Sequence, residues 1–423
     1  MNLMVIGGGG REHAIIRSLK KSPDVDVIYA LPGNGGIASD AICVPEIGAK
    51  DIDAQVAFAL DHSIDYAVVA PDDPLALGAV DALTAAGIPC FGPRKNAAII
   101  ESSKAFSKDL MKKYGIPTAS SETFTDLEAA YAYLDRSPAP IVVKADGLAL
   151  GKGVIIAQTT QEAKEAVREM MAEKKFGDSG SKVVIEEFLT GPEVSVLSFT
   201  DGKTVIPMVS SMDHKRIGDG DTGLNTGGMG TIAPNPCYTP EMAERCMEEI
   251  FLPTVRAMAA EGCPFRGCLY FGLMLTADGP RVIEYNCRFG DPETQVVLPL
   301  LQTDLLTIMQ AVEQGTLAQL DIRWKQESAA CVVLASGGYP AGYEKGKPIH
   351  LPERFDPHVT CFHAGTGLRD GKLVTTGGRV LGLTATAPTL EQALKLAYAA
   401  AEQVDFEKKY LRRDIGKRAL ELL

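Results

Sequence analysis

The chain has 423 residues, of which 46% are hydrophobic and 23% are charged, and its formal net charge is −12. At about 100 to 200 residues per domain, this length predicts roughly three domains with ample buried core. The acidic balance argues against nucleic acid or an anionic membrane as a partner, because such surfaces repel a protein that has no long Lys or Arg run.

The first hundred residues alternate short apolar runs with helical patterns. The run at 3–7 predicts a buried strand, a helix from Glu12 follows it, and further strands are predicted at the ranges 26–31, 66–70 and 88–93. Buried strands separated by helices indicate a parallel α/β sheet. The next helix follows Ser102 and ends at Gly115, with Pro117 just beyond, which is typical of a helix stop.

A compact α+β unit comes next in the chain. Strands are predicted at 139–147, 153–159 and 182–189, with a helix from Gln161 to about Glu173. A unit of about 70 residues has the size of a small lobe or lid on a larger domain. We therefore expect a lid over about 120–190.

The remaining chain contains two predicted hairpins and a C-terminal unit. Asp-Gly turns join strands around 193–209 and around 267–286, since this dipeptide favours tight hairpin turns. Between the hairpins lie a glycine-rich loop at 213–230 and a helix at 240–261. Strands from 328 to 387 and a helix from Leu390 suggest a separate C-terminal domain. We expect domain boundaries at 1–101, 102–325 and 326–423.

The nine cysteines are scattered, without a CxxC pair or a histidine at zinc-finger spacing. Such usage favours reduced thiols. No apolar run reaches the ~18 residues that span a bilayer, and the apolar start is too short for a signal peptide. These features predict a soluble cytoplasmic protein that binds neither nucleic acid nor membrane.

The glycine cluster at 5–13, VIGGGGREH, follows a strand and opens a helix. A dinucleotide-binding GxGxxG pattern fails here, because it would place Glu12 or His13 at the third glycine, and the second strand lacks the acidic residue that meets the ribose. Backbone amides at a helix start beside Arg11 remain a good phosphate or carboxylate site. The alternative is a tight turn with glycines for packing, and the glycine density favours binding.

A second glycine-rich segment, GLALGKGV at 147–154, nearly imitates a P-loop. Its glycines are separated by three residues instead of four, and Gly153 stands where Ser or Thr should hold Mg²⁺. Because strands flank it on both sides, it predicts a hairpin loop whose amides and Lys152 close over a triphosphate. Lys144 would project toward the same phosphates, since a lysine in an apolar strand is costly to bury without an anion.

The segment RVIEYNCRFGDPETQ at 281–295 combines two oxygen ligands with an arginine. Alternate side chains of a strand share a face, so Glu284 and Asn286 lie together, and Arg288 joins them if the extended conformation continues. A carboxylate with an amide oxygen suits Mg²⁺ or Mn²⁺. A polar strand end with a capping Asn is the alternative, and the other phosphate motifs favour the metal.

In this order, Lys144, the 147–154 loop, Glu186, Glu187, Glu193, Glu284 and Asn286 resemble the ATP-grasp superfamily. Within it, GGGGREH (7–13), PGNGG (32–36), SKAFSKDLM (103–111), DHKRIGDGDTGLNTGGMG (213–230), YNCRFGDPETQ (285–295) and FHAGT (362–366) are similar to the phosphoribosylamine–glycine ligase family, also called glycinamide ribonucleotide synthetases. The likeness covers essentially the whole chain. It implies an α/β and α+β multidomain fold: an N-terminal parallel α/β (pre-ATP-grasp) domain, an ATP-grasp fold with a small lid, and a C-terminal β-rich α+β domain.

The resemblance also implies an activity and a set of binding residues. The family joins glycine to phosphoribosylamine with cleavage of ATP in purine synthesis, using Mg²⁺ or Mn²⁺. The implied ATP contacts are Lys104 and Lys144 on the phosphates, Gly151, Lys152 and Gly153 in the covering loop, Glu186, Glu187 and Leu189 around adenine, and Glu193 on the ribose. The implied metal ligands are Glu284 and Asn286.

The expected chemistry needs no protein nucleophile. Glycine carboxylate attacks the γ-phosphate, and the amine then attacks the resulting acyl phosphate, so the protein supplies positioning and charge neutralisation. We expect Arg288 to neutralise the negative charge on the reacting carboxyl and phosphoryl oxygens. Asp213, with Lys215, is the candidate to bind the glycine ammonium group or to accept the proton of the incoming amine. The alternative is that Asp213 forms an Asx turn that opens the loop. His214 is a second candidate base.

For phosphoribosylamine, we expect the N-terminal loop to hold the phosphate through Gly9, Gly10 and Arg11, with Asn34 and Gly35 assisting. The partners expected are the small molecules ATP, glycine and phosphoribosylamine, bound by a monomer. The alternatives are another ATP-grasp carboxylate–amine ligase or carboxylase, a nucleotide-binding regulatory protein without chemistry, and, distantly, an NAD oxidoreductase.

Overall fold

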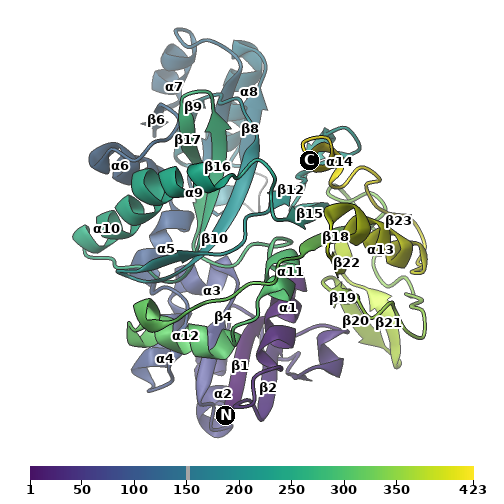
Figure 1. Cartoon of the computed structure of the whole chain (residues 1–423). Coiled ribbons are helices and arrows are strands. Elements are labelled where there is room, and N and C mark those ends of the chain that lie inside the picture. Colours follow the sequence, from purple (N-terminus) through teal and green to yellow (C-terminus); the bar gives the residue numbers. More distant parts are fainter. Residues whose placement is uncertain (149–152) are drawn as a thin grey trace.

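The structure is a computed structural model that describes residues 1–148 and 153–423. Figure 1 shows the N-terminal domain at the bottom, a central domain with a lobe at the top, and a C-terminal domain at the right. Every helix among the described residues is too short or too polar to cross a membrane.

The N-terminal domain contains a five-stranded parallel sheet in the order β3-β2-β1-β4-β5, which confirms the predicted α/β architecture. Its strands are β1 (Asn2–Gly7), β2 (Val27–Pro32), β3 (Ile42–Cys43), β4 (Tyr66–Val69) and β5 (Cys90–Phe91). Its helices are α1 (Gly10–Leu19), α2 (Ile52–Asp61), α3 (Asp72–Leu77), α4 (Ala79–Ala85) and α5 (Lys95–Ser102). Helix α1 begins two residues before the predicted Glu12, because the Glu12 carboxylate caps it by accepting from the Gly9 N–H at 2.6 Å.

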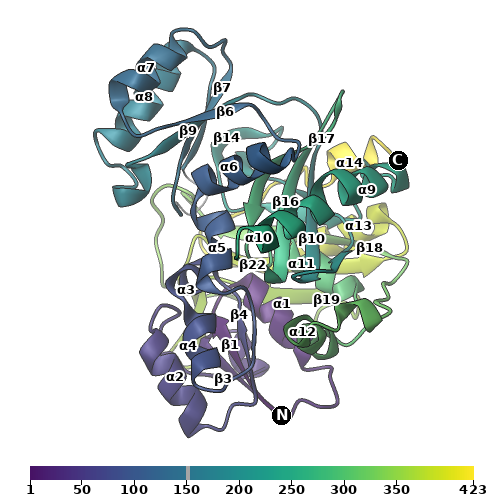
Figure 2. The same cartoon turned by 90° about the vertical axis from the view of Figure 1, so that its left-hand side faces the viewer.

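The lobe is an antiparallel sheet in the order β6-β9-β7-β8, covered by two helices. Its elements are β6 (Ser121–Phe124), α7 (Leu127–Leu134), β7 (Ile141–Ala145), β8 (Val154–Ala157), α8 (Thr160–Met171) and β9 (Val183–Glu187). The lobe has a hydrophobic core of its own, which includes Val143, Val167 and Ile185. Figures 1 and 2 both show it projecting away from the N-terminal domain.

The central domain is organised around a four-stranded antiparallel sheet in the order β11-β10-β16-β17. The strands are β10 (Glu193–Asp201), β11 (Val205–Pro207), β16 (Arg266–Thr276) and β17 (Gly279–Asn286), and the predicted Asp-Gly hairpins are present. The helices are α6 (Lys104–Tyr114), α9 (Pro240–Cys246), α10 (Leu252–Ala260), α11 (Thr294–Val297) and α12 (Leu305–Gln314). The central and N-terminal domains share one hydrophobic core.

The single helix predicted at 240–261 is interrupted. A π-helical turn, Met247–Phe251, separates α9 from α10. Pro253 lies in the first turn of α10 and has no N–H to donate to the preceding turn, which explains the change of hydrogen-bond spacing.

The C-terminal sheet has the order β12-β15-β18-β22-β19, and β23 pairs with β18. Its strands are β12 (Met212–Asp213), β15 (Gly230–Ala233), β18 (Ser328–Ser336), β19 (Val359–His363), β22 (Arg379–Ala387) and β23 (Lys409–Tyr410). A hairpin of β20 (Thr366–Arg369) and β21 (Lys372–Thr375) and the helices α13 (Leu390–Glu402) and α14 (Lys417–Leu420) complete the domain. Two strands therefore come from the central part of the chain.

The glycine-rich segment at 213–230 is a short hairpin instead of an irregular loop. Strands β13 (Arg216–Gly218) and β14 (Thr222–Asn225) pair antiparallel. Gly220 and Asp221 have φ values of 69° and 54°, the left-handed conformation that tight turns require. Its flanking strands, β12 and β15, anchor the hairpin to the C-terminal sheet.

Candidate active site

Glu284 and Asn286 lie near the carboxyl end of β17, and both side chains are half-buried. Glu284 Oε1 lies 3.5 Å from Lys215 Nζ. Burial alone would raise the pKa of the Glu284 carboxyl. The ammonium groups of Lys215, Lys144 and Lys104 outweigh burial and hold this pKa below its usual range. The carboxyl is therefore ionised at neutral pH, as a metal ligand must be.

Arg288 owes its position to an ion pair and not to strand alternation. Strand β17 ends at Asn286, so the extended conformation stops before Arg288. Arg288 Nη2 lies 2.8 Å from Glu101 Oε1, and the two side chains are 18% and 7% exposed. The buried Arg288 Nε has no hydrogen-bond partner among the described residues. A buried guanidinium N–H without a partner is suited to an incoming anionic oxygen.

A buried cluster of three charges lies between the lobe and α6. Glu186 forms ion pairs with Lys144 and Lys108 through its two carboxylate oxygens. Lys144 Nζ also donates to the Ile283 carbonyl at 3.0 Å, which connects the cluster to β17. Burial alone would raise the pKa of the Glu186 carboxyl, but the two lysines lower it. The cluster carries one net positive charge, which favours an anionic ligand such as a triphosphate.

Lys104 is the first residue of α6, which Ser103 caps by accepting from the Phe106 N–H at 3.1 Å. Its Nζ donates to the Gly147 carbonyl at 2.9 Å, so it lies beside the predicted phosphate-covering loop. Burial lowers the pKa of Lys104. The Gly153 carbonyl accepts from the Ala145 N–H at 2.8 Å, where the β7–β8 hairpin closes. The other two loop residues predicted to bind ATP, Gly151 and Lys152, lie outside the described residues.

The segment between β9 and β10 carries the residues assigned to adenine and ribose. The Glu187 carboxylate accepts from the Ser120 N–H at 2.9 Å and pairs with Arg281 at 3.2 Å. Leu189 is half-buried, and Glu193 is exposed at the start of β10. Because the Glu186 and Glu187 carboxylates are already paired, the backbone of this segment is what remains to contact a base.

Lys215 connects the predicted ribose and metal residues. Its Nζ lies 3.6 Å from Glu193 Oε2, in addition to the contact with Glu284. Burial alone would lower the pKa of Lys215, but the Glu284 and Glu193 carboxylates raise it well above its usual value. Lys215 is therefore positively charged, and the structure brings it from the segment 213–230 to β17.

Asp213 and Glu293 form a second carboxyl pair near Lys215. Burial and then the charge of Glu293 raise the pKa of Asp213 well above its usual value. Burial also raises the pKa of Glu293. Asp213 Oδ1 accepts from the His214 N–H at 2.7 Å and thereby stabilises the local turn. The same carboxyl also interacts with the charges of Glu293 and Lys215. A carboxyl with a raised pKa holds a proton more readily than an ordinary carboxyl, which makes this pair a candidate for proton transfer.

His214, the second candidate base, has both ring nitrogens engaged in hydrogen bonds. Its side chain is buried, Nδ1 donates to the Gly230 carbonyl at 3.1 Å, and Nε2 accepts from the Gly416 N–H at 3.1 Å. Both ring nitrogens are therefore used. The histidine fastens the hairpin to the C-terminal tail.

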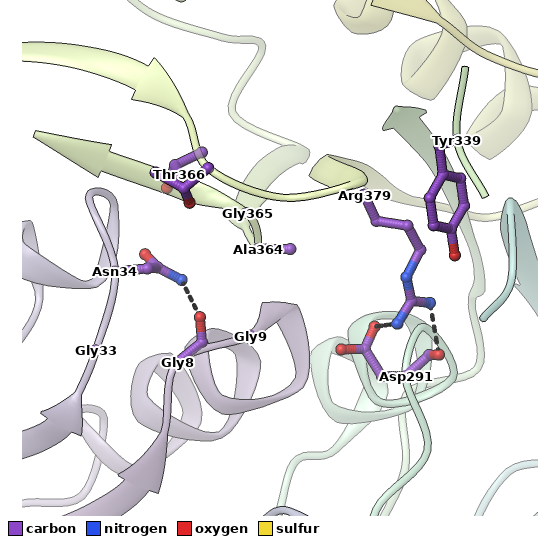
Figure 3. A pocket seen from close by; sticks show the side chains of 11 residues that line it. Gly8, Gly9, Gly33, Asn34, Asp291, Tyr339, Ala364, Gly365, Thr366 and Arg379 are labelled. Atoms are coloured by element: carbon purple, nitrogen blue, oxygen red, sulfur yellow. Dashed lines mark hydrogen bonds and ion pairs between the residues drawn. The ribbon is translucent and has the colours of Figure 1, made fainter. Parts of the chain in front are cut away.

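A cavity of about 320 Å³ lies where the N-terminal, central and C-terminal parts of the chain meet (Figure 3). Glycines and small side chains form much of its wall, with one arginine and one aspartate. The lining residues are Gly8, Gly9, Gly33, Asn34, Asp291, Tyr339, Ala364, Gly365, Thr366, Thr376 and Arg379.

Of the residues predicted to bind phosphoribosylamine, Gly9 and Asn34 line this cavity, whereas Gly10, Arg11 and Gly35 do not. Arg11 pairs with Glu12 at 2.6 Å and donates to the Phe289 carbonyl at 3.2 Å. A side chain at Gly10 would meet Gln295, and the Gly35 N–H donates to the Thr366 carbonyl at 3.1 Å.

Asn34 connects two domains at the cavity wall. Its Nδ2 donates to the Gly8 carbonyl at 3.0 Å and to the His363 carbonyl at 2.8 Å, while Oδ1 accepts from the Gly36 and Ile37 N–H groups at 2.9 Å. The Asn34 side chain therefore shapes the cavity, and the first of these bonds is visible in Figure 3.

Sequence reasoning missed the cationic side of the cavity. Arg379 Nη1 donates to the Gly227 carbonyl at 2.7 Å and to the Asp291 carbonyl at 2.8 Å. Figure 3 shows Arg379 and Asp291 on one side of the cavity and Thr366 on the other. Glu101, Lys108 and Glu293 were also missed. The FHAGT segment was a signal for Thr366, and the helical spacing of Lys104 and Lys108 was one for Lys108.

Comparison with known proteins gives consistent matches along the chain. Phosphoribosylglycinamide synthetase models match residues 1–101 (N domain), 102–294 (ATP-grasp domain) and 329–418 (C domain). The phosphoribosylamine–glycine ligases of Vibrio cholerae and Agrobacterium fabrum are 50% and 49% identical, each over 99% of both chains.

Solved structures agree with the same assignment of the fold. The crystal structure of the phosphoribosylamine–glycine ligase from Thermotoga maritima is similar at a TM-score of 0.87 and 36% identity, over 98% of this chain and 100% of that one. A biotin carboxylase from Campylobacter jejuni reaches a TM-score of 0.76 at 14% identity, over 97% and 92% of the chains, which shows the fold alone. The predicted ATP-grasp architecture is confirmed.

Proposed function

The chain belongs to the phosphoribosylglycinamide synthetase family, and we infer from this that it joins glycine to phosphoribosylamine while cleaving ATP to ADP and phosphate. It is an ATP-dependent carbon–nitrogen ligase whose product, glycinamide ribonucleotide, is an intermediate of de novo purine biosynthesis.

The segment 284–291 connects the two halves of the proposed site. The short segment 284–291 passes from the lysine-rich side of the site to the cavity: Glu284 contacts Lys215 at its start, and Asp291 lines the cavity with Arg379 at its end. Arg288 lies between them. A sugar phosphate amine in the cavity would thus reach the region where ATP phosphorylates a carboxylate.

We propose that ATP binds between the lobe and the central sheet. The net positive cluster of Lys108, Lys144 and Glu186, with Lys104, faces the triphosphate, and Glu193 meets the ribose. The separate hydrophobic core of the lobe supports a rigid-body movement over the bound nucleotide.

The residues of β17 fit a divalent ion. Glu284 supplies an ionised carboxylate, and the amide nitrogen of Asn286 is directed toward Glu101, so its oxygen is the atom left for a cation. Within residues 1–148 and 153–423, no group of three or more His, Cys, Asp or Glu side chains is placed to hold a metal. A bound Mg²⁺ or Mn²⁺ would neutralise charge on the phosphates.

In the first proposed step, a glycine carboxylate oxygen attacks the γ-phosphorus of ATP and ADP leaves, which gives glycyl phosphate. The Arg288 guanidinium, with its free Nε–H, would stabilise the negative charge on the reacting oxygens. Lys215 adds a second positive charge beside β17, the strand that carries Glu284 and Asn286. The chain holds the reactants in line and neutralises charge, which is the larger part of catalysis in phosphoryl transfer.

In the second proposed step, the amine lone pair attacks the acyl carbon of glycyl phosphate, and phosphate leaves with one oxygen that came from glycine. Asp213 would take the proton that the amine sheds, because its raised pKa makes it a stronger base than an ordinary carboxylate. The phosphoribosyl group would occupy the cavity, with its phosphate near the Gly8–Gly9 backbone and the Arg379 guanidinium.

The test is ADP release with ATP, Mg²⁺, glycine and phosphoribosylamine formed in place from ribose phosphate and ammonia, omitting each component in turn. Turnover that requires both glycine and the amine supports the proposal. Turnover without glycine would assign the chain to another ATP-grasp carboxylate–amine ligase or carboxylase. Glycine labelled with heavy oxygen in its carboxylate should transfer one label to phosphate, and unlabelled phosphate would contradict a glycyl phosphate intermediate.

We propose that the enzyme works in the cytoplasm as a monomer on these small molecules. All nine cysteines are free thiols in the structure, which agrees with a reducing compartment. Light scattering on the purified protein would test the monomer, and a particle of twice the mass would contradict it.

A further inference from the structure

Glu101 has no assigned role in the reaction, yet it contacts three consecutive residues at the centre of the site. It is the penultimate residue of α5, and its side chain is 7% exposed. Its Oε2 accepts from the backbone N–H of Cys287 at 2.7 Å. Its Oε1 lies 2.8 Å from Arg288 Nη2, and it lies 3.0 Å from the Asn286 amide nitrogen when that amide is oriented by its hydrogen-bonding neighbours.

These contacts decide how the Asn286 amide is oriented. Its nitrogen donates both to Glu101 Oε1 and to the Tyr285 carbonyl at 3.2 Å. Since both neighbours are acceptors, the amide nitrogen must face them and the amide oxygen must face away. The orientation that suits a metal ligand is therefore set by Glu101 together with the Tyr285 carbonyl of β17.

The same carboxylate fixes Arg288. Residues beyond the end of β17 lack the ladder hydrogen bonds that hold a strand, so the positions of Cys287 and Arg288 depend on other contacts. Glu101 supplies them: one oxygen holds the backbone and the other holds the guanidinium. The opposite charge of Arg288 offsets part of the cost of burying the Glu101 carboxylate, although burial still leaves the pKa of Glu101 raised.

We propose that Glu101 is the positioning residue of this site, which sets the Asn286 amide for the metal and the Arg288 guanidinium for the reacting oxygens through one carboxylate. The inference rests on the proposed function for the identity of the reaction. The geometry of the three contacts does not depend on that reaction. Outer contacts of this kind orient metal ligands, and their loss changes metal affinity or activity by about 10- to 100-fold.

The decisive variant is Glu101→Gln, which keeps the shape and one acceptor oxygen. The Gln oxygen can still accept from Cys287, but its NH₂ group then faces two donors, on Asn286 and Arg288. We expect kcat for ADP release to fall about 10- to 100-fold with a small change in the KM for ATP. A variant that is only less stable would not show this combination of a lower kcat and a nearly unchanged KM for ATP.

A second measurement does not require turnover. Mn²⁺ added together with ADP should raise Tm above the value with ADP alone, because ligands that bind the folded state stabilise it. In Glu101→Gln this additional increase should be largely lost, while the increase from ADP alone remains. If wild-type protein shows the Mn²⁺ effect but no ligase turnover, the proposed reaction fails and the role of Glu101 is still tested.

The matched control is Glu261→Gln, which removes another ion-paired carboxylate of the central domain. Glu261 pairs with Lys113 and Tyr114 at the surface, and neither belongs to the site. It should behave as wild type in both measurements. Glu101→Asp keeps the charge but is one methylene shorter, so we expect intermediate values. Wild-type kcat and a wild-type Mn²⁺ effect in both Glu101 variants would overturn the proposal.

Discussion

Arg379 Nη2 lies 3.5 Å from Asp291 Oδ1, so an ion pair joins the C-terminal domain to the segment that follows Arg288. The charges of Arg379 and then Arg11 hold the pKa of the Asp291 carboxyl below its usual range, although burial alone would raise it. Both residues line the cavity (Figure 3). The ion pair thus connects the wall of the cavity to the segment that carries Arg288.

Arg379→Gln should raise the KM for phosphoribosylamine about 10- to 100-fold, because a charge-assisted hydrogen bond to phosphate contributes about 1.5–3 kcal/mol. The KM for ATP should change little. Steady-state kinetics with each substrate varied in turn would measure both. Arg369→Gln, at the exposed end of strand β20, is the control. An unchanged KM for the amine would remove Arg379 from the substrate site.

Lys108→Met should raise the KM for ATP about 10-fold, because the buried cluster around Glu186 would lose its net positive charge. Lys112→Met is a matched control on the same helix, since the Lys112 side chain is 77% exposed. Nucleotide affinity can be measured by fluorescence titration without turnover. Equal affinity in the two variants would argue against a role of the cluster in phosphate binding.

Gly8→Ala should impair binding of the amine substrate selectively. A Cβ atom at Gly8 would lie 2.3 Å from the Gly33 carbonyl oxygen, so the backbone at one of these two cavity-lining glycines would have to shift. We expect a higher KM for phosphoribosylamine and unchanged nucleotide affinity. Gly48→Ala is the control, because a Cβ atom there meets no atom within 4 Å. Normal kinetics in Gly8→Ala would contradict the assignment of the cavity.

Stability should fall as the pH is lowered from about 6.5 toward 3, because His363 stays neutral in the folded protein. Burial and the neighbouring His13 lower the pKa of His363 to about 3. The unfolded chain protonates near pH 6.5, so it binds more protons and is favoured below that pH. At pH 5 the loss from this histidine is on the order of 2 kcal/mol relative to neutral pH.

Urea denaturation at neutral pH and at about pH 5 would measure this loss. In His363→Gln, the difference in the free energy of unfolding between the two pH values should shrink. In His358→Gln, at an exposed position, this difference should stay as in wild type. An equal pH dependence in wild type and His363→Gln would show that the buried histidine does not cause the effect.

Arg412→Met should destabilise the protein by about 2–4 kcal/mol and lower kcat. Arg412 is 1% exposed and pairs with Asp221 at 2.9 Å and with Asp414 at 2.8 Å. Removing it leaves charged partners without compensation and releases the hairpin that carries Lys215. Arg413→Met removes an exposed neighbour that pairs with Glu402. Chemical denaturation and ADP release should distinguish Arg412→Met from Arg413→Met. Equal stability of the two variants would contradict the role of Arg412 in holding the hairpin.

Most strands and helices could be predicted from local patterns. The parallel sheet, the two Asp-Gly hairpins and the strand that carries Glu284 and Asn286 all follow from alternation and buried runs. The hairpin at 213–230 could not be predicted, because its glycines hide the alternation of side chains. The π-helical turn before Pro253 was missed because helical periodicity continues through it.

The sequence by itself determined most of the secondary structure, the family and the residue types suited to ATP chemistry, because periodicity, turn residues and motif spacing are properties of neighbouring residues. Only the tertiary structure decided which charges meet: Glu101 with Arg288, Lys108 with Glu186, and Arg379 with Asp291. These partners lie far apart in the chain, and their contacts depend on sheet order and on how the domains pack. The cavity between the N-terminal and C-terminal domains exists for the same reason.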